Sequence, residues 1–245
     1  MLSALPDQSQ FFQTIWYIIK TFYPIILYGL GITFLLSVVG TVGGFVLSIS
    51  LTQARLVNID RKRDKKANIF FKAATRSVAN GYVTLFRGTP MIVQSMIIFY
   101  GISALKIFPW WTPLTAGLII VTINTTAYIS EVLRGSVQGI SVGQMEAGRS
   151  LGLTHGQTMR KIIWPQAIKN SLPGIGNEFV VNLKDTAVLS VISVVDLFYA
   201  VRQSASSNYR YVEAVIVAAI IYLIITYTSS KVIAFLEKRI GTVGP

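Results

Sequence analysis

The chain has 245 residues, of which 52% are hydrophobic and only 13% charged, and its mean hydropathy is +0.58. Soluble domains carry about a quarter charged residues, so this composition indicates a membrane protein with several spans. There is no cysteine and a single histidine, His155, which excludes thiolate metal sites and argues against any histidine-based metal or catalytic centre. The net charge of +12 does not indicate nucleic-acid binding, because the basic residues cluster in loops between apolar segments.

Five apolar segments are long enough to cross a bilayer, for which about 20 residues suffice. They predict an all-α membrane protein with five transmembrane helices. The segment before them, residues 10–23, predicts an interfacial helix or a lead-in to the first span. We expect one transmembrane domain over residues 1–245, with spans at about 24–51, 88–107, 114–133, 172–197 and 212–235.

Basic residues mark one side of this topology. The loop between the first two spans, the loop after the third span and the C-terminal tail hold 17 of the 22 basic residues. Lysine and arginine accumulate in cytoplasmic loops, so we predict an N-terminus outside and a C-terminus in the cytoplasm. The cluster at 61–66 is expected to be topogenic, with contact to anionic lipid as the alternative. Residues 67–86 predict an amphipathic helix at the membrane surface.

The loop at about 136–168 is much longer than a connection between two spans requires. Thr154 and Gln157 fit a capping box, which predicts a helix from near His155 to a stop near Pro165. Gly152 is a good C-terminal stop for a preceding helix. Two short helices at an angle would form a knob that fits a groove on a partner. An amphipathic loop without a partner remains the other interpretation.

The residues of this loop and its flanks together resemble the type I permeases of ABC importers, in the polar amino-acid subfamily of histidine, glutamine and arginine permeases. The resemblance covers roughly residues 25–237. Gly148 stands where a second alanine is common, and Trp164 where leucine is usual. The residues that carry the resemblance are Glu146-Ala147, Gly152, Ile162, Pro165, Ala127-Tyr128, Glu131, Arg134-Gly135, Gly143-Gln144, Phe86-Arg87-Gly88-Thr89-Pro90 and Asn182-Leu183-Lys184-Asp185-Thr186.

The resemblance implies that the loop is a coupling helix which enters a cleft of a separate ATPase subunit. Glu146, Ala147 and Gly152 match the motif, and Arg149 and Leu151 lie between them as contacts expected from position alone. It also implies a second permease copy or homologue, an extracytoplasmic amino-acid-binding protein and a bacterial plasma membrane. The chain lacks a GxxxxGK[ST] loop, so we expect it to be no enzyme and to bind no cofactor, with ATP and magnesium in the ATPase.

The predicted fourth span is unusually polar. Ionisable groups within a bilayer are costly and suggest a function. At about 100° per residue, Glu178, Asn182 and Asp185 lie within roughly 60° on one helix face, whereas Lys184 points about 100° away from Asp185. These residues are candidates for a path taken by a zwitterionic or cationic solute. A polar network between helices or subunits is the alternative.

The turn Arg87-Gly88-Thr89-Pro90 is interpreted as structural, with Arg87 at the lipid headgroups. Two further functions remain open at this point. One is a secondary transporter that uses Glu178 and Asp185 to couple transport to an ion gradient. The other is a membrane scaffold or sensor that recruits a cytoplasmic partner and transports nothing.

Overall fold

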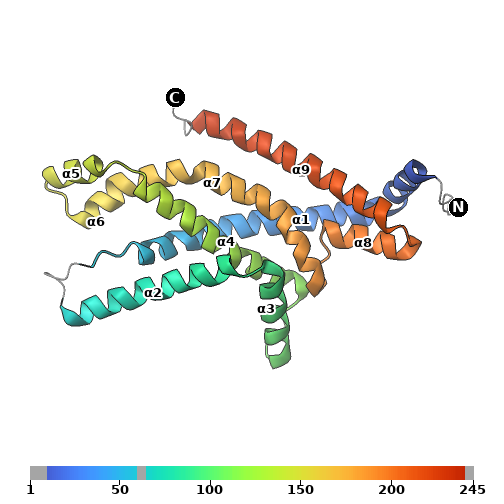
Figure 1. Ribbon diagram of the computed structural model, residues 1–245, viewed down its shortest axis with the longest axis horizontal. Coiled ribbons are helices and arrows are strands. Elements are labelled where there is room, and N and C mark those ends of the chain that lie inside the picture. The colour runs from blue at the N-terminus through green and yellow to red at the C-terminus, as the bar shows by residue number, and fades with distance from the viewer. Residues whose placement is uncertain (1–9, 60–64, 241–245) are drawn as a thin grey trace. The chain divides into compact units, whose positions relative to one another are not determined.

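The computed structural model describes residues 10–59 and 65–240, and the secondary structure of these residues is entirely helical (Figure 1). Most of the basic cluster 61–66 lies outside them. The chain forms two compact units, each from three segments. The first unit comprises Met1–Gly40, Met91–Val121 and Phe179–Lys231, and the second comprises Thr41–Pro90, Thr122–Glu178 and Val232–Pro245.

Three helices are long and apolar enough to cross a membrane: α1 (Phe11–Arg55), α4 (Pro113–Gln138) and α9 (Tyr211–Ile240). They contain the first, third and fifth predicted spans. Within the predicted segment 10–23, residues 11–23 are the N-terminal part of α1, which runs as one helix of 45 residues with Pro24 inside it, so they form a lead-in to the first span and not a separate interfacial helix. Membrane helices tolerate an internal proline where neighbouring groups satisfy the freed carbonyl.

The other two predicted spans differ from expectation. Helix α2 (Lys66–Gly88) meets α3 (Met91–Leu105) at a bend of 109°, and the two qualify as a span only when taken together. Alone, α3 covers about 22 Å, less than a hydrocarbon core of about 30 Å. Helix α7 (Trp164–Asp185) is too polar to qualify and gives way to the 3-10 helix η2 (Thr186–Ile192). The described residues therefore provide three spans, or four with the bent pair, and not five.

The first unit is held together by two buried apolar clusters. One joins α1, α7, α8 (Leu197–Asn208) and α9 around Ile18, Leu183 and Val217. The other joins α1, α4 and the end of η2 around Leu36, Ile120 and Leu189. Between helices in a bilayer such side chains stabilise through close packing, because lipid tails are as apolar as they are.

A buried carboxylate fixes the start of α8 in this unit. Asp196 is fully buried and caps the helix, with its Oδ1 accepting a hydrogen bond from the Tyr199 N–H at 2.9 Å. The Tyr222 hydroxyl donates to Oδ2 at 3.4 Å, and the Leu197 N–H donates to Thr33 Oγ1 at 3.1 Å. These hydrogen bonds tie α1, α8 and α9 together. They also give each buried polar group a partner away from water.

The second unit contains the C-terminal end of α1, all of α2, most of α4 and the loop helices. Polar bonds join several of its helices. The Tyr82 hydroxyl of α2 donates to the Ile123 carbonyl of α4, and the Thr52 hydroxyl of α1 donates to the Ser130 carbonyl at 3.2 Å. Interhelical hydrogen bonds of this kind stabilise helix pairs in membranes by about 1 kcal/mol each.

Candidate functional site

The loop after α4 folds into two short helices, α5 (Val142–Ser150) and α6 (His155–Thr158). At the end of α5, Gly152 adopts a left-handed conformation with φ of 83°. The Leu153 N–H donates to the Gly148 carbonyl at 3.1 Å, and the Gly152 N–H donates to the Arg149 carbonyl at 3.0 Å. This is a Schellman motif, so the prediction that Gly152 ends the helix is confirmed.

The start of α6 is also confirmed. The Thr154 N–H donates to Gln157 Oε1 at 2.8 Å, and the Gln157 N–H donates back to Thr154 Oγ1 at 3.3 Å. These reciprocal bonds form the predicted capping box and satisfy two of the N–H groups that a helix start leaves without partners.

The predicted stop near Pro165 is wrong. The helix continues from α6 through a π-helical segment, η1 (Met159–Ile163), into α7, which ends at Asp185. A proline inside a helix has no N–H to donate to the carbonyl four residues earlier, and its ring crowds that carbonyl. The wider π turn directly before Trp164-Pro165 accommodates this ring, so the helix continues where the sequence suggested a break.

The two short helices α5 and α6 form a helical hairpin, and Gly148 lies where they meet. It is buried, and a Cβ at this position would lie 2.5 Å from Thr158 Cγ2 and 3.1 Å from Ile162 Cδ1. Real Cβ atoms essentially never show the first distance, and the second is tighter than nine in ten real Cβ contacts. The backbone of α5 thus lies directly against α6 and η1, which explains why this chain has glycine where alanine is common in the motif.

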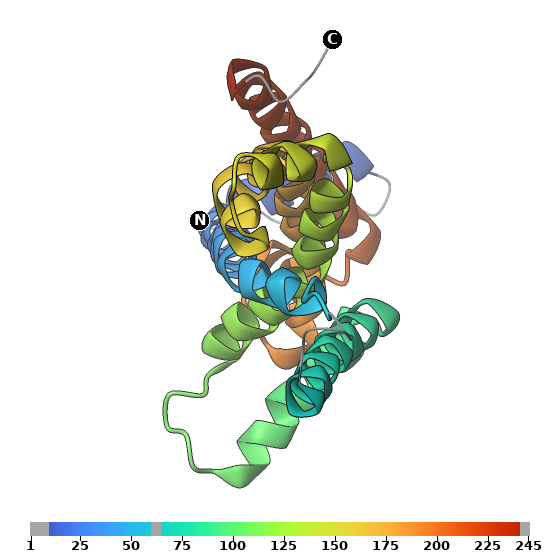
Figure 2. The same cartoon turned by 90° about the vertical axis from the view of Figure 1, so that its left-hand side faces the viewer.

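The five predicted coupling residues, Glu146, Ala147, Arg149, Leu151 and Gly152, are all exposed. Leu151 is 80% exposed, and Val142, at the other end of α5, is 72% exposed. Figure 2 looks onto this end of the chain and shows α5 beside α6. The hairpin therefore presents apolar and charged side chains outward from a backbone that is fixed by its caps and by Gly148.

The candidate path residues all lie on the last two turns of α7. The helix is α-helical through Asp185, so Glu178, Asn182 and Asp185 keep the shared face that their spacing predicts. Asn182 is buried, Glu178 is half-buried, and Lys184 and Asp185 are exposed. Their role in a path stays a prediction.

Thr186, the next residue, begins η2 and is fully buried. Its Oγ1 is the one buried side-chain oxygen or nitrogen in the described part of the chain without a hydrogen-bond partner. Buried hydroxyls normally have a partner, so this atom calls for an explanation. Its burial, which is the signal that makes Thr186 a candidate, could not be read from the sequence.

Sequence reasoning missed an ion-pair cluster around Glu131 of α4. Its carboxylate binds Arg55 of α1 at 2.7 Å and the neighbouring Arg134, and Arg87 of α2 approaches to 3.9 Å. The Arg55 guanidinium also donates hydrogen bonds to Asn80 Oδ1 at 3.0 Å and to Ser130 Oγ at 3.3 Å. One carboxylate thereby connects three helices of the second unit.

The turn Arg87-Gly88-Thr89-Pro90 forms the bend between α2 and α3. Thr89 Oγ1 donates to the Leu85 carbonyl at 2.8 Å and closes the end of α2. Arg87 lies over the Tyr128 ring at 5.5 Å and near Glu131, so its guanidinium is directed at α4. No group of three acidic or histidine side chains within residues 10–59 and 65–240 is placed to hold a metal ion.

Comparison with known proteins relates the chain to transport permeases. The nopaline transport system permease protein NocM of Agrobacterium fabrum is 34% identical over 88% of this chain and 87% of its own length. The glutamine transport system permease protein GlnP of Escherichia coli is 33% identical over 91% and 96%. A crystal structure of an amino acid ABC transporter with histidines matches with a TM-score of 0.78 and 35% identity, over 90% of this chain and 96% of that one.

The methionine transporter MetNI in an inward-facing conformation has a TM-score of 0.71 at 18% identity and shows the shared fold. The family model described as the binding-protein-dependent transport system inner membrane component matches residues 66–242, which include the hairpin, Glu131 and α7. The chain is therefore a multi-pass membrane protein, and it belongs to this family of inner membrane permease components.

Proposed function

We propose that this chain is the transmembrane permease subunit of an ATP-driven importer for a polar amino acid. A separate ATPase is coupled to it through residues 143–165. The observation that carries the proposal is the hairpin of α5 and α6, with its internally fixed backbone and its exposed Glu146 and Leu151. The related permeases of nopaline, arginine and glutamine transport support an amino acid as the substrate.

In this function the hairpin acts mechanically. The exposed Leu151 enters an apolar cleft of the ATPase, and Glu146 and Arg149 form polar contacts at the rim of that cleft. A fixed backbone transmits displacement because packed elements shift as bodies and do not deform continuously. The continuous helix from His155 to Asp185 carries this displacement along the chain. ATP and magnesium act in the ATPase, and this chain performs no chemistry.

The hairpin faces the cytoplasm in this proposal, together with the C-terminal end, and the N-terminus lies outside. The distribution of basic residues supports this orientation. The membrane is the plasma membrane of a bacterium. The chain acts as one permease domain that pairs with itself or a homologue, and an extracytoplasmic binding protein delivers the amino acid.

The path for the amino acid runs along the polar end of α7. Carboxylates of Glu178 and Asp185 attract the amino group, and the buried Asn182 and Thr186 side chains provide hydrogen bonds to polar atoms of the solute. The Thr186 hydroxyl, which has no hydrogen-bond partner in the structure, gains one when the solute passes. Alternating access then exposes this end of α7 first to one side and then to the other.

Transport in proteoliposomes that contain the permease, its ATPase and the binding protein tests the coupling. Leu151→Ala and Glu146→Gln should each reduce amino-acid-stimulated ATP hydrolysis and uptake about tenfold, because they remove contacts at the centre of the interface. Leu236→Ala, which changes an exposed leucine of α9 in the same way, is the matched control and should retain both activities.

Full activity of both hairpin variants would refute the coupling assignment. Uptake that persists after ATP depletion would instead identify a secondary transporter, and an assembled complex without any uptake would identify a scaffold or sensor.

A further inference from the structure

Three adjoining cavities form one groove in the second unit, between the end of α1, α2 and the helix of α6, η1 and α7. Their volumes are about 370, 420 and 430 Å³. Met159 lines all three, and Trp164 lines the second and third. Each volume is in the range of pockets that hold organic ligands, about 300–1,000 Å³, and far exceeds that of a water molecule.

The groove combines an apolar body with a basic rim. Its body is lined by Leu56, Val57, Met159 and Trp164 together with the polar Gln53, Asn58 and His155, and its rim by Lys72, Arg76 and Arg160. None of the described residues that line it is acidic. A ligand that fits must therefore carry both a negative charge and an apolar portion.

The charges of the rim differ in what they can offer a ligand. Arg55 also borders the groove, but its guanidinium is bound to Glu131, Asn80 and Ser130. Arg76 and Arg160 are exposed and have no hydrogen-bond or ion-pair partner among the described residues. Their positive charge is thus available to an anion at the rim.

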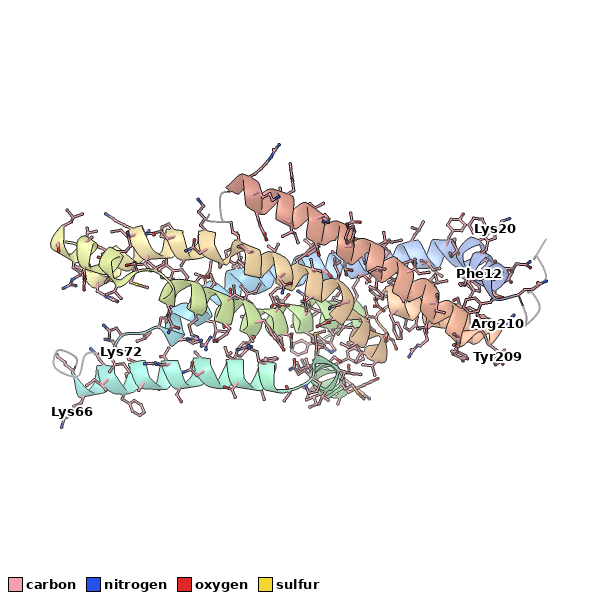
Figure 3. The ribbon with its side chains drawn as sticks, turned by 45° about the horizontal axis from the view of Figure 1, so that its top comes forward. Phe12, Lys20, Lys66, Lys72, Tyr209 and Arg210 are labelled. Atoms are coloured by element: carbon pink, nitrogen blue, oxygen red, sulfur yellow. The ribbon has the colours of Figure 1, made fainter. Side chains whose placement is uncertain are left out.

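The position of the groove indicates where such a ligand comes from. The residues Leu56 and Val57 directly follow Arg55, the last residue of the membrane-spanning α1. Lys72 lies near the N-terminal end of α2, and Figure 3 shows it at the same end as Lys66. The groove therefore opens where a membrane span ends, at the level of the lipid headgroups. Basic pockets between helices on the cytoplasmic side are suited to anionic headgroups.

We propose that this groove binds an anionic phospholipid. Arg76 and Arg160 attract the anionic headgroup, Lys72 adds charge to the rim, and one acyl chain lies along Leu56, Met159 and Trp164. The π turn of η1 contributes to the fit, because Met159 begins it and Trp164 directly follows it. Since α6 and η1 form one wall, the bound lipid links the membrane surface to the hairpin. This proposal does not depend on the identity of the transported solute or on coupling to an ATPase.

Trp164 provides a direct probe. The chain has four tryptophans, and the background Trp16→Phe/Trp110→Phe/Trp111→Phe leaves Trp164 as the fluorophore. The full chain is placed in nanodiscs of phosphatidylcholine that contain either dibrominated phosphatidylglycerol or dibrominated phosphatidylcholine at the same mole fraction. We expect stronger quenching of Trp164 by the anionic lipid. Lys72→Gln/Arg76→Gln should weaken this preference by roughly fivefold for each charge removed.

The control is Lys238→Gln/Arg239→Gln, which removes two exposed charges of α9 that do not line the groove, and it should keep the preference. Arg76→Gln alone serves if the double variant does not fold, and circular dichroism monitors folding. Equal quenching by both lipids would overturn the proposal, as would a preference that survives Lys72→Gln/Arg76→Gln. Loss of the preference on addition of millimolar inorganic phosphate would overturn it in favour of a soluble anion.

Discussion

The two units of the chain are stabilised in different ways. Both buried apolar clusters belong to the first unit, where Ile18, Leu183 and Leu189 are fully buried. In the second unit, the helices are joined by the Glu131 cluster and by the close approach of Gly148 to Thr158. The amphipathic groove also lies there.

This difference has a physical meaning. Apolar packing is non-directional, so many side chains share the energy and small shifts cost little in any one contact. Ion pairs and close backbone contacts depend on a few specific atoms. A unit joined in the second way has few arrangements of similar energy, which is what the proposed coupling through the hairpin of α5 and α6 requires.

Removal of the Glu131 charge should have the largest effect on stability. Glu131→Gln leaves Arg55 and Arg134 without their carboxylate. We expect the free energy of unfolding of the second unit to fall by about 2–3 kcal/mol. Hydrogen exchange should rise in α2 and in the C-terminal part of α4. The control Glu146→Gln changes an exposed carboxylate and should leave exchange in α2 unchanged. Unchanged exchange in Glu131→Gln would show that the cluster does not join these helices.

Gly148→Ala should have the next largest effect, because the new methyl group overlaps Thr158 Cγ2. Overpacking of this kind costs about 1–3 kcal/mol. We expect faster exchange in α5 and α6, together with weaker binding of the ATPase. Thr158→Ser removes the overlapping methyl group and should restore the hairpin in the double variant. If the single variant behaves like the original chain, the close contact has no structural consequence.

The smallest effect on stability is expected at Thr186, although transport should change. Thr186→Val replaces a hydroxyl that has no partner, so the melting temperature should stay the same, whereas the apparent affinity for the amino acid should fall about fivefold. Thr33→Val is the matched control in the same unit. It leaves the buried Leu197 N–H without an acceptor and should cost about 1–3 kcal/mol. Normal transport by Thr186→Val would remove this residue from the path.

The sequence predicted the features that local patterns determine. The capping box at Thr154 and the left-handed Gly152 follow from residues close together in the chain, and the apolar lengths of α1, α4 and α9 follow from composition. The clustering of Arg55 with Glu131 could not be predicted in this way. The two residues are far apart in sequence, and only packing of α1 against α4 brings their side chains together.

The errors also have local causes. Pro165 is a strong stop signal, but the π turn before it allows the helix to continue. Residues 172–197 were expected to be one span, although an unusually polar one, but α7 ends at Asp185 and a 3-10 helix begins at Thr186. The role of Gly148 as a contact point was not predicted, because a glycine inside a helix gives no sign of what faces it.

The π turn at Met159–Ile163 also sets the rotational phase of the helix that follows it. A π turn contains about one residue more than an α turn, and one residue corresponds to about 100° of rotation and 1.5 Å of rise. Deletion of one residue here would restore α-helical spacing and turn everything after it by that angle relative to α6. The direction in which Glu178, Asn182 and Asp185 face is thus determined some fifteen residues earlier, beside the hairpin.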